Sequence, residues 1–401
     1  MAMCDSGRRV FLAGGGTGGH LYPGLAVAEA LRLARPDTAI AFSTTRKAID
    51  RHVLAAHDYP ATPIAAEPFR PHPWTWPRLA ASLARTWWQT WRRFRQFCPE
   101  VVVGLGGYGS FAPVRQAQRA GLATVVLNPD IVPGRANRRL GRRADLVACQ
   151  FQETLQYFGP AARLTGCPVR PGLLRAGRRD GMAALGLDAS RRTLLVTGAS
   201  SGAQTVNRAV LGMLRENGLP PSWQVLHLTG ESDYETVAAA YQGLNVSAVV
   251  RPYLDDMGLA YAAADLAVAR AGASTLAELL ALGVPAVFLP YPFHRDRHQM
   301  RQARAVEMQG AAVVVRDRPD DPAATSRELA EAVEPLLRDE VRRATMRRDA
   351  RRVARPDAAA AIAGEVLRLA DAAAARRHEA IRADVDRRPP APYTPAEDTI
   401  P

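Results

Sequence analysis

Cysteine is scarce in this sequence, and long apolar runs are missing from it. The four cysteines, at positions 4, 98, 149 and 167, form no C-x-x-C pair, which argues against a zinc knuckle or a disulfide framework and fits a reducing compartment. No uncharged apolar run approaches the length that spans a bilayer, and the N-terminus lacks the apolar segment and cleavage site of a secretory signal. We therefore expect a soluble or peripheral protein.

Lysine is almost absent, yet the chain is strongly basic. Lys47 is the only lysine and the formal net charge is +13, so arginine supplies nearly all of the positive charge. Codon bias in a GC-rich genome explains the choice of arginine over lysine, but it does not explain the excess of positive charge. That excess predicts an anionic partner, which is phosphate, nucleic acid or acidic lipid.

The first half of the chain alternates short apolar runs with helical stretches. The expected strands are 10–13, 39–42, 101–103 and 124–127, and the expected helices are 21–31, 78–97 and 113–120. Near-continuous apolar strands alternating with helices predict a parallel sheet that is covered on both faces.

The same pattern restarts after a Gly/Arg-rich stretch, with expected strands at 193–196, 224–228, 248–250, 266–268 and 286–289. At 401 residues the chain suits two domains. We predict an α/β protein whose two doubly wound, Rossmann-like domains face each other across a cleft. The expected division is a first domain at 1–170, a linker at 171–190, a second domain at 191–355, an Ala-rich helix at 356–375 that packs back on the first domain, and a disordered tail at 376–401.

Three glycine-rich loops follow expected strands, at 14–19, 104–109 and 198–203. Glycine at a strand-to-helix joint lets the backbone approach a phosphate at a helix N-terminus. Each loop alone is also explained by a tight turn, and for the second loop the two explanations are equally good. Together the three loops indicate substrates that carry a diphosphate, held at the mouth of the cleft.

A nicotinamide-binding site is an alternative explanation of these loops. That reading needs an acidic residue at the end of the second strand to bind the ribose, where the chain has Ser43, Thr44, Thr45 and Arg46, with Asp50 only in the next helix. Ser43 and Arg46 suit a phosphorylated cofactor, but a dehydrogenase leaves His20 and the glycine loop of the second half unexplained. We therefore expect no cofactor.

Several motifs, in order along the chain, carry a family resemblance. They are GGGTGGHLYPG at 14–24, GLGGYGS at 104–110, VPGRANR at 132–138, GCPVR at 166–170, GASSGAQTVN at 198–207, YLDDM at 253–257, RAGASTLAE at 270–278 and DRHQ at 296–299. Over roughly residues 8–370 the chain resembles the family that adds N-acetylglucosamine (GlcNAc) to lipid I, which gives lipid II in bacterial peptidoglycan synthesis. The resemblance implies the GT-B fold and an inverting transfer without a metal. Asp255 and Asp256 are adjacent and so form no D-x-D metal motif.

The resemblance also implies a binding site for the donor, UDP-GlcNAc. Glu278 would accept hydrogen bonds from both ribose hydroxyls, since a carboxylate offers two acceptor oxygens to a diol. Without the resemblance, an ordinary solvated glutamate on a helix would be the preferred interpretation of Glu278. The backbone of Leu254 would meet uracil, Ser200 the diphosphate, and Arg170 the leaving UDP. The full expected set of substrate-binding residues is Thr17, Gly18, Gly19, Asp130, Asn137, Arg170, Ser200, Asn207, Leu254, Arg270, Ala273, Ser274, Thr275, Leu276, Ala277, Glu278, His298 and Gln299.

His20 is the candidate general base, because it ends the first glycine loop and imidazole titrates in the required range. The alternative is that His20 orders the loop or binds phosphate of the acceptor. His294 and His298 have the i, i+4 spacing of zinc ligands, but no glutamate follows His294, so a polar helix surface or a sugar contact by His298 explains them better.

One stretch departs from the family. The family has His-Glu-Gln-Asn where this chain has Leu127-Asn128-Pro129-Asp130, while Asn137 downstream is retained. The family glutamate thus becomes Asn128, and Asp130 could substitute for the lost carboxylate. This stretch lies on the acceptor side, so the acceptor or the proton pathway could differ.

Five of the six tryptophans lie between positions 74 and 91, interleaved with arginines. Indole prefers the membrane interface and arginine binds anionic head groups. The expected membrane contacts are Trp74, Trp76, Trp87, Trp88 and Arg92, with one or two of the indoles packing inward. Nucleic-acid binding would use the same residue types, but no nucleic-acid-binding motif accompanies them.

The sequence therefore predicts a glycosyltransferase that is peripheral at the cytoplasmic face of the membrane. Its expected partners are UDP-GlcNAc, a lipid-linked diphosphate acceptor and an anionic membrane surface, and no nucleic acid is expected. Two alternatives remain, namely a UDP-sugar transferase with another lipid acceptor and a non-catalytic protein that binds nucleotide sugars at the membrane.

Overall fold

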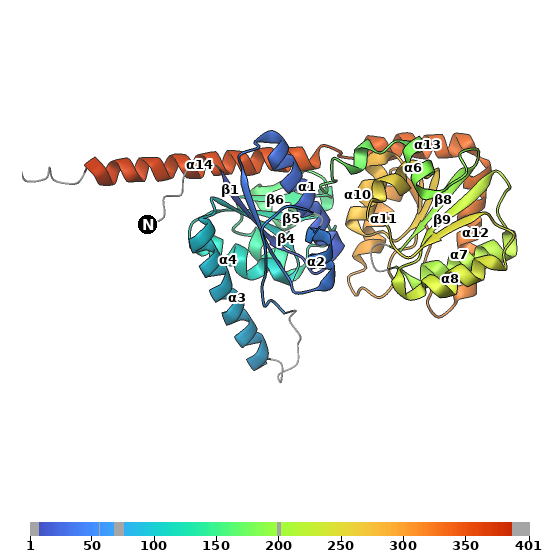
Figure 1. Cartoon of the computed structure of the whole chain (residues 1–401), viewed down its shortest axis with the longest axis horizontal. Coiled ribbons are helices and arrows are strands. Elements are labelled where there is room, and N and C mark those ends of the chain that lie inside the picture. Colours follow the sequence, from blue (N-terminus) through green and yellow to red (C-terminus); the bar gives the residue numbers. More distant parts are fainter. Residues whose placement is uncertain (1–7, 56, 68–75, 199–201, 387–401) are drawn as a thin grey trace, which may run out of the picture.

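Two parallel β-sheets, each covered by helices, make up the protein (Figure 1). The computed structural model describes residues 8–55, 57–67, 76–198 and 202–386. The predicted α/β class, with two facing Rossmann-like domains, is confirmed.

The first domain contains a seven-stranded sheet in the order β3-β2-β1-β4-β5-β6-β7, and every pair of neighbours is parallel. Its strands are β1 (Arg9–Gly14), β2 (Ala39–Thr44), β3 (Ala61–Pro63), β4 (Val101–Gly106), β5 (Ala123–Asn128), β6 (Leu146–Cys149) and β7 (Ala162–Leu164). Its helices are α1 (Gly18–Ala34), α2 (Ala48–Ala55), α3 (Trp76–Phe97), α4 (Phe111–Arg119) and α5 (Arg135–Gly141). The strand order reverses between β1 and β4, so the ends of these two strands mark the position where doubly wound domains bind ligands.

The second domain contains a six-stranded sheet in the order β10-β9-β8-β11-β12-β13, again parallel throughout. Its strands are β8 (Arg192–Thr197), β9 (Trp223–Leu228), β10 (Ala248–Arg251), β11 (Leu266–Ala269), β12 (Ala286–Phe288) and β13 (Ala312–Val314). Its helices are α6 (Arg178–Leu185), α7 (Gln204–Asn217), α8 (Tyr234–Gln242), α9 (Met257–Ala263), α10 (Ala273–Leu282), α11 (His298–Glu307), α12 (Pro322–Arg338) and α13 (Glu340–Val353). Here the switch point lies between β8 and β11.

The stretch expected to be a linker, 171–190, differs from that expectation because it contains α6. Met182 and Leu185 are buried in the core of the second domain, and α6 packs on α9. Gly181 permits this contact, since a Cβ at that position would lie 2.4 Å from the carbonyl oxygen of Leu259. Residues 178–185 are therefore part of the second domain.

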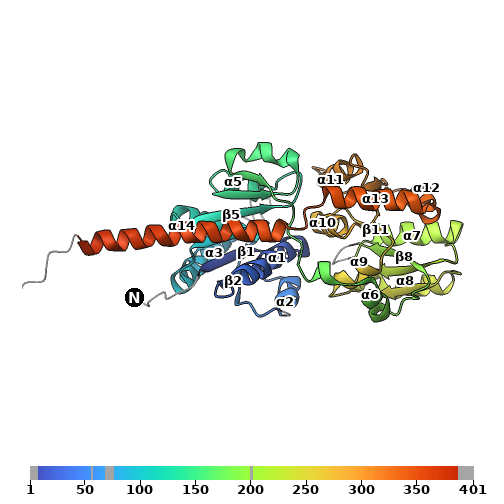
Figure 2. The ribbon, with the colours of Figure 1, turned by 90° about the horizontal axis from the view of Figure 1, so that it is seen from above.

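The last helix, α14 (Ala358–Asp386), returns to the first domain and packs on α1. Ile362 and Val366 are buried in the first domain's core, and Asp371 forms ion pairs with Arg8 at 2.6 Å and Arg35 at 2.8 Å. The helix continues eleven residues past 375, where we expected the tail to begin, and projects beyond the body of the domain (Figure 2). Residues 387–401 of the expected tail lie outside the described residues.

Within the described parts of the chain, no helix has both the length and the apolar character that crossing a bilayer would require.

Candidate active site

A pocket between the two domains is lined by eight of the eighteen predicted substrate-binding residues. The first domain contributes Gly18, Gly19 and Tyr22 from α1. Arg170, on the segment between β7 and α6 that joins the two domains, also lines the pocket. The second domain contributes Tyr253, Leu254, Met257 and Tyr261, together with Ala273, Ser274, Thr275 and Glu278 of α10. Direct contacts close the pocket across the domains, because the hydroxyls of Tyr22 and Tyr253 are 3.0 Å apart and Ser274 Oγ donates to the carbonyl of Gly19 at 3.3 Å.

Two helix N-termini meet at this pocket. Helix α1 begins after Thr17 and α10 begins after Gly272, and neither helix has a side-chain cap or an acidic residue in its first turn. The first backbone N–H groups of a helix have no partner within the helix, and the helix dipole adds positive potential there. An anion with two phosphate groups is therefore the kind of ligand that this junction suits.

Glu278 lies in the second turn of α10 and is 9% exposed. Its carboxylate accepts a hydrogen bond from the hydroxyl of Tyr261 at 2.8 Å. Burial raises the pKa of Glu278 to about 7, against the opposing effects of Tyr261 and of the positive charge of Arg170. The Glu278 carboxylate can accept more hydrogen bonds than the one from Tyr261, and the two hydroxyls of a ribose would supply two further donors.

Arg170 provides a positive charge that acts on this carboxylate. Its guanidinium lies 4.5 Å from the centre of the Tyr22 ring, and its Nε atom is buried without a hydrogen-bond partner. An unpaired buried donor is costly unless a ligand completes it. Arg170 is thus suited to receive an anionic group of the ligand, as the resemblance implied.

His20 lies on the first turn of α1 and is half-buried. Its Nδ1 is 3.0 Å from Oγ1 of Thr17. The second glycine loop makes room for the ring, because a Cβ at Gly106 would lie 2.8 Å from His20 Cδ2 and one at Gly107 would lie 3.2 Å from Cε1. This contact gives the second loop a role in positioning His20.

The environment of His20 favours the neutral form of its ring. Desolvation lowers its pKa, and the positive charge of Lys47 acts in the same direction, whereas Asp130 and Asp50 oppose the shift. A neutral imidazole is the form that can accept a proton.

Asp50 is a residue of the site that the sequence did not reveal. Its side chain is fully buried and accepts hydrogen bonds from the backbone of Gly16 at 2.8 Å, from the backbone of Thr45 at 3.0 Å and from Thr45 Oγ1 at 2.6 Å. Asp50 therefore stabilises the first glycine loop by accepting a hydrogen bond from its backbone at Gly16. A single aspartate in a helix carries no sequence signal for this role, because the loop and the helix meet only in the folded chain.

The stretch that departs from the family forms a small polar network. Asn128 is buried; it donates to the carbonyl of Asp130 at 2.8 Å and its Oδ1 accepts from Asn137 at 3.0 Å. Asn137 also donates to the carbonyl of Leu127. The side chains of both asparagines therefore hydrogen-bond to backbone carbonyls of this stretch and stabilise its conformation. The carboxylate of Asp130 is partly exposed and, within the described part of the chain, accepts no hydrogen bond.

Two expected substrate-binding residues have protein partners and do not line the pocket. Arg270 forms a buried ion pair with Asp317 at 2.7 Å and donates to the carbonyl of Leu289. Asn207 joins Thr229, Asp233 and His227 in a buried network, in which burial lowers the pKa of His227 to about 3. Both side chains stabilise the loops of the second domain in this structure.

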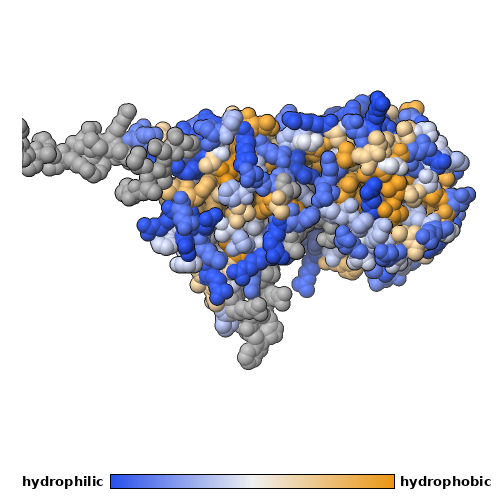
Figure 3. Space-filling model, in the orientation of Figure 1, coloured by the Kyte–Doolittle hydropathy of each residue, from blue (hydrophilic) through white to orange (hydrophobic). Residues whose placement is uncertain are grey.

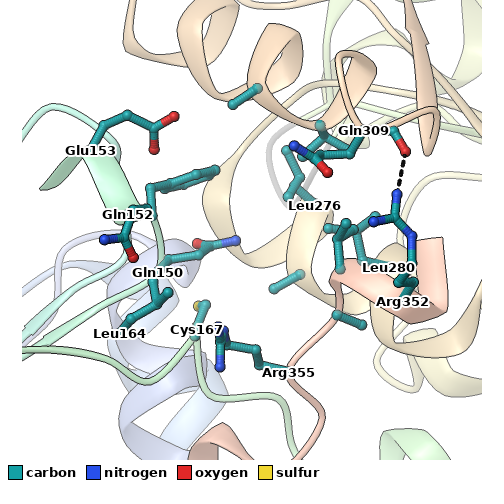
Figure 4. Close-up of a pocket in the computed structure, with 17 residues that line it drawn as sticks. Gln150, Gln152, Glu153, Leu164, Cys167, Leu276, Leu280, Gln309, Arg352 and Arg355 are labelled. Carbon is teal, nitrogen blue, oxygen red and sulfur yellow. Dashed lines mark hydrogen bonds between the residues drawn. The ribbon is translucent and has the colours of Figure 1, made fainter. Parts of the chain in front are cut away.

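Leu276 and Ala277 face a different space. They line a cavity of about 420 Å³ on the other side of α10, bounded by Gln150, Cys167 and Arg355 (Figure 4). The periodicity of a helix explains this, since residues 274, 275 and 278 share one face while 276, 277 and 280 share another. Their side chains therefore support α10 and do not line the pocket between the domains.

The remaining predicted residues follow β12. Gln299 accepts a hydrogen bond from the backbone of Tyr291 at 2.9 Å, and His298 Nδ1 is 2.8 Å from Asp296 Oδ1. Neither residue lines the donor pocket. Ser200 and Trp74 lie outside the described residues.

Helix α3 carries the other predicted membrane contacts. Trp76, Trp88 and Arg92 are exposed, as is Trp91. Trp87 is half-buried, and Arg119 of α4 lies 4.9 Å from its ring. The helix projects from the first domain (Figure 1), in a region where the surface mixes hydrophilic and apolar residues (Figure 3).

Comparisons with known proteins agree with the two-domain fold. Residues 10–149 match the model of the glycosyltransferase family 28 N-terminal domain, and residues 193–362 match that of the family 28 C-terminal domain. The chain is 35% identical over 372 residues to the UDP-N-acetylglucosamine--N-acetylmuramyl-(pentapeptide) pyrophosphoryl-undecaprenol N-acetylglucosamine transferase of Desulforudis audaxviator, covering 90% of this chain and 98% of that one. The protein of the same name from Desulforamulus reducens is 32% identical over 365 residues, covering 87% and 95%. The crystal structure of Acinetobacter baumannii MurG has the same fold, with a TM-score of 0.69, 24% identity, and coverage of 90% of this chain and 99% of that one.

Proposed function

The chain belongs to glycosyltransferase family 28, and on that premise we propose that it transfers GlcNAc from UDP-GlcNAc to the MurNAc-pentapeptide that undecaprenyl diphosphate carries, as lipid I is converted to lipid II. The observation that carries the proposal is the convergence of two helix N-termini, Arg170 and Glu278 on one pocket between the domains. The names of the relatives support the choice of sugar and acceptor.

UDP-GlcNAc would bind with its ribose against Glu278 and its base against Leu254. The diphosphate would lie at the start of α10, near Arg170. Negative charge grows on the diphosphate as the bond to the sugar breaks, and N–H groups at a helix N-terminus together with an arginine stabilise that charge without a metal ion. These contacts are therefore stronger in the transition state than in the ground state.

The transfer would proceed by a single displacement. The hydroxyl oxygen of the acceptor forms a bond to the anomeric carbon on the face opposite UDP, the bond to the diphosphate breaks, and UDP leaves with the electron pair. The proton of the hydroxyl passes to His20, which is neutral in its desolvated environment. One displacement inverts the anomeric configuration.

One observation favours a second candidate acceptor. Asn128, in place of the family glutamate, is committed to hydrogen bonds with the carbonyl of Asp130 and the side chain of Asn137, and Asp130 presents the carboxylate instead. A different lipid-linked sugar would fit the same donor pocket with an altered acceptor side.

We also propose that the enzyme works at the cytoplasmic face of the membrane, where its acceptor is anchored. The exposed indoles of Trp76, Trp88 and Trp91 on α3 support this, together with Arg92 and Arg95, which lie 5.8 Å and 5.1 Å from the rings of Trp88 and Trp91. Indole and guanidinium suit the interface and the anionic head groups, respectively. We propose no nucleic-acid partner.

A UDP-release assay with UDP-GlcNAc and a lipid I analogue tests the proposed function. Turnover with lipid I is the expected result, with calorimetric binding of UDP-GlcNAc in the absence of acceptor. Turnover only with another polyprenyl-diphosphate sugar would favour the second candidate. Binding of UDP-GlcNAc without turnover on any lipid would contradict both.

A further inference from the structure

The loop between β10 and α9 of the second domain lies against the first domain. The hydroxyl of Tyr253 in this loop is 3.0 Å from the hydroxyl of Tyr22 on α1, and Oδ1 of Asp255 is 3.1 Å from Nε2 of His52 on α2. The rings of His52 and Tyr253 also meet edge to face, with their centres 5.9 Å apart. Leu254, whose backbone we expect to meet uracil, therefore lies between two residues that contact the first domain.

The two cross-domain contacts of this loop differ in their exposure to solvent. The side chains of His52 and Asp255 are 60% and 80% exposed, and an exposed pair of this kind contributes little. Tyr22 and Tyr253 are half-buried, and both line the pocket between the domains. Burial raises the pKa of the Tyr22 hydroxyl, which therefore stays protonated and able to donate. The hydroxyl pair is thus the contact whose loss should have a measurable effect.

The ring of Tyr22 makes a second contact in the same pocket. The guanidinium carbon of Arg170 lies 4.5 Å from the centre of this ring, which is within the range of a cation–π interaction. One side chain of the first domain therefore touches both the loop expected to meet uracil and the arginine expected to meet the diphosphate.

Helix α1 holds Tyr22 firmly in the first domain. Its neighbours Leu21 and Leu25 are fully buried in that domain's core. Gly24 lies so close to β4 that a Cβ at this position would be 2.5 Å from Cδ1 of Leu105. Because α1 is packed in this way, Tyr22 reaches Tyr253 only when the two domains come together as whole bodies.

We propose that Tyr22 is a positioning residue that couples the affinity for the donor to closure of the two domains, because its hydroxyl holds the loop that carries Leu254 and its ring holds the guanidinium of Arg170. This inference rests on the proposed function, since it takes UDP-GlcNAc as the ligand of the pocket. When the domains close, the wall for the base and the positive charge for the diphosphate come into place together. A donor that uses both contacts binds the closed arrangement better than the open one, and so stabilises it.

Removing the two contacts separately tests the inference in the complete chain. Tyr22→Phe loses only the hydroxyl, and we expect it to raise the Kd and the KM of UDP-GlcNAc about 2- to 10-fold, with a smaller change in kcat. Tyr253→Phe should have the same effect. The double variant should bind no more weakly than the weaker single one, because both changes break the same hydrogen bond.

Tyr22→Leu removes the ring as well as the hydroxyl. We expect kcat to fall in this variant too, because Arg170 is no longer held against a diphosphate whose negative charge grows in the transition state. Tyr59→Phe, the same chemical change at a half-buried tyrosine outside the pocket, is the matched control and should match the wild type. A Tyr22→Phe protein with wild-type affinity for UDP-GlcNAc would overturn the inference, as would effects that multiply in the double variant.

A distance measurement without donor separates a failure of this inference from a failure of the proposed function. Spin labels at Leu33→Cys on α1 and Val341→Cys on α13 report the separation of the two domains by electron paramagnetic resonance, because both positions are exposed. The labelled chain carries serine in place of Cys4 and Cys98, and the other two cysteines are buried.

Tyr22→Phe should broaden the distribution of distances between the labels, whereas Tyr59→Phe should leave it as in the wild type. A distribution that Tyr22→Phe does not change would overturn the coupling. If the wild type does not bind UDP-GlcNAc, the proposed function fails, and the distances still decide whether Tyr22 holds the two domains together.

Discussion

The hydroxyl of Tyr261 donates to the carboxylate of Glu278 at 2.8 Å, inside a pocket that buries both side chains. Tyr261 lies on α9 and Glu278 on α10, so the hydrogen bond joins the two helices that flank the expected uridine site. It fixes one oxygen of the carboxylate and leaves acceptor capacity for a ligand.

Replacing Glu278 with Gln should separate binding from stability. The loss of a hydrogen bond to a charged group should weaken UDP binding about 10- to 100-fold, as measured by calorimetry.

Because the pKa of Glu278 is about 7 in the folded protein against an ordinary 4.5, the folded state holds this proton more tightly than the unfolded chain. The stability of the ligand-free protein should therefore fall as pH rises from about 4.5 to 7, by up to about 3 kcal/mol, and Glu278→Gln should remove that slope in pH-dependent urea denaturation. Glu334→Gln, on the exposed side of α12, is the control and should change neither quantity; a Glu278→Gln protein that binds UDP normally would contradict the site.

Arg270 should matter for stability more than for direct contact with the donor. Arg270→Ala leaves the buried carboxylate of Asp317 without its counter-ion, which typically costs about 3–5 kcal/mol. Chemical denaturation measures this loss, and the double variant Arg270→Leu/Asp317→Leu should recover much of it because no buried charge remains. A stable Arg270→Ala protein that has lost UDP binding would instead show that the guanidinium contacts the ligand directly.

The rate of transfer should depend on pH through His20. Because desolvation lowers the pKa of His20, the ring stays neutral down to pH values below the ordinary 6.5, so kcat/KM should fall only on the acid side of that value. His20→Ala should lower kcat about 100-fold or more with UDP-GlcNAc binding retained. An acid limb that is unchanged in a still-active His20→Ala enzyme would assign the proton transfer to another group.

Helix α3 should bind membranes through its exposed indoles. Trp88→Ser with Trp91→Ser should reduce co-sedimentation with vesicles that contain anionic phospholipid, because two interfacial side chains are lost. Leu33→Ser removes an apolar side chain that is 65% exposed on α1 and serves as the control. Equal sedimentation of the Trp88/Trp91 variant and the wild type would rule out α3 as the docking surface.

Much of the pocket between the domains could be predicted from local sequence, because backbone conformation and helix position are local properties. The loop at 14–19 and the segment 270–278 lie where strands end and helices begin, and the structure places α1 and α10 there with their N-termini toward one pocket. The helical position of Glu278 was likewise predictable, although its burial was not.

Roles that depend on distant partners could not be predicted. Arg270 and Asn207 are predicted substrate contacts, and the structure adds that both hydrogen-bond to buried groups contributed by other segments. Leu276 and Ala277 fall on the opposite face of the same helix from Glu278. Residues 178–185 lacked a clear apolar periodicity in the sequence, yet they form helix α6. This helix packs closely on α9, since Gly181 has no Cβ that would clash with the carbonyl oxygen of Leu259.

The amino-acid sequence by itself thus determined the two α/β domains, the glycine loops and the family, because strand periodicity and glycine's backbone freedom act between near neighbours in the chain. Only the tertiary structure decided which charges are buried and that Asp50 holds the first glycine loop. Desolvation and electrostatic pairing depend on distances through space, and those distances exist only once the two domains are folded and face each other.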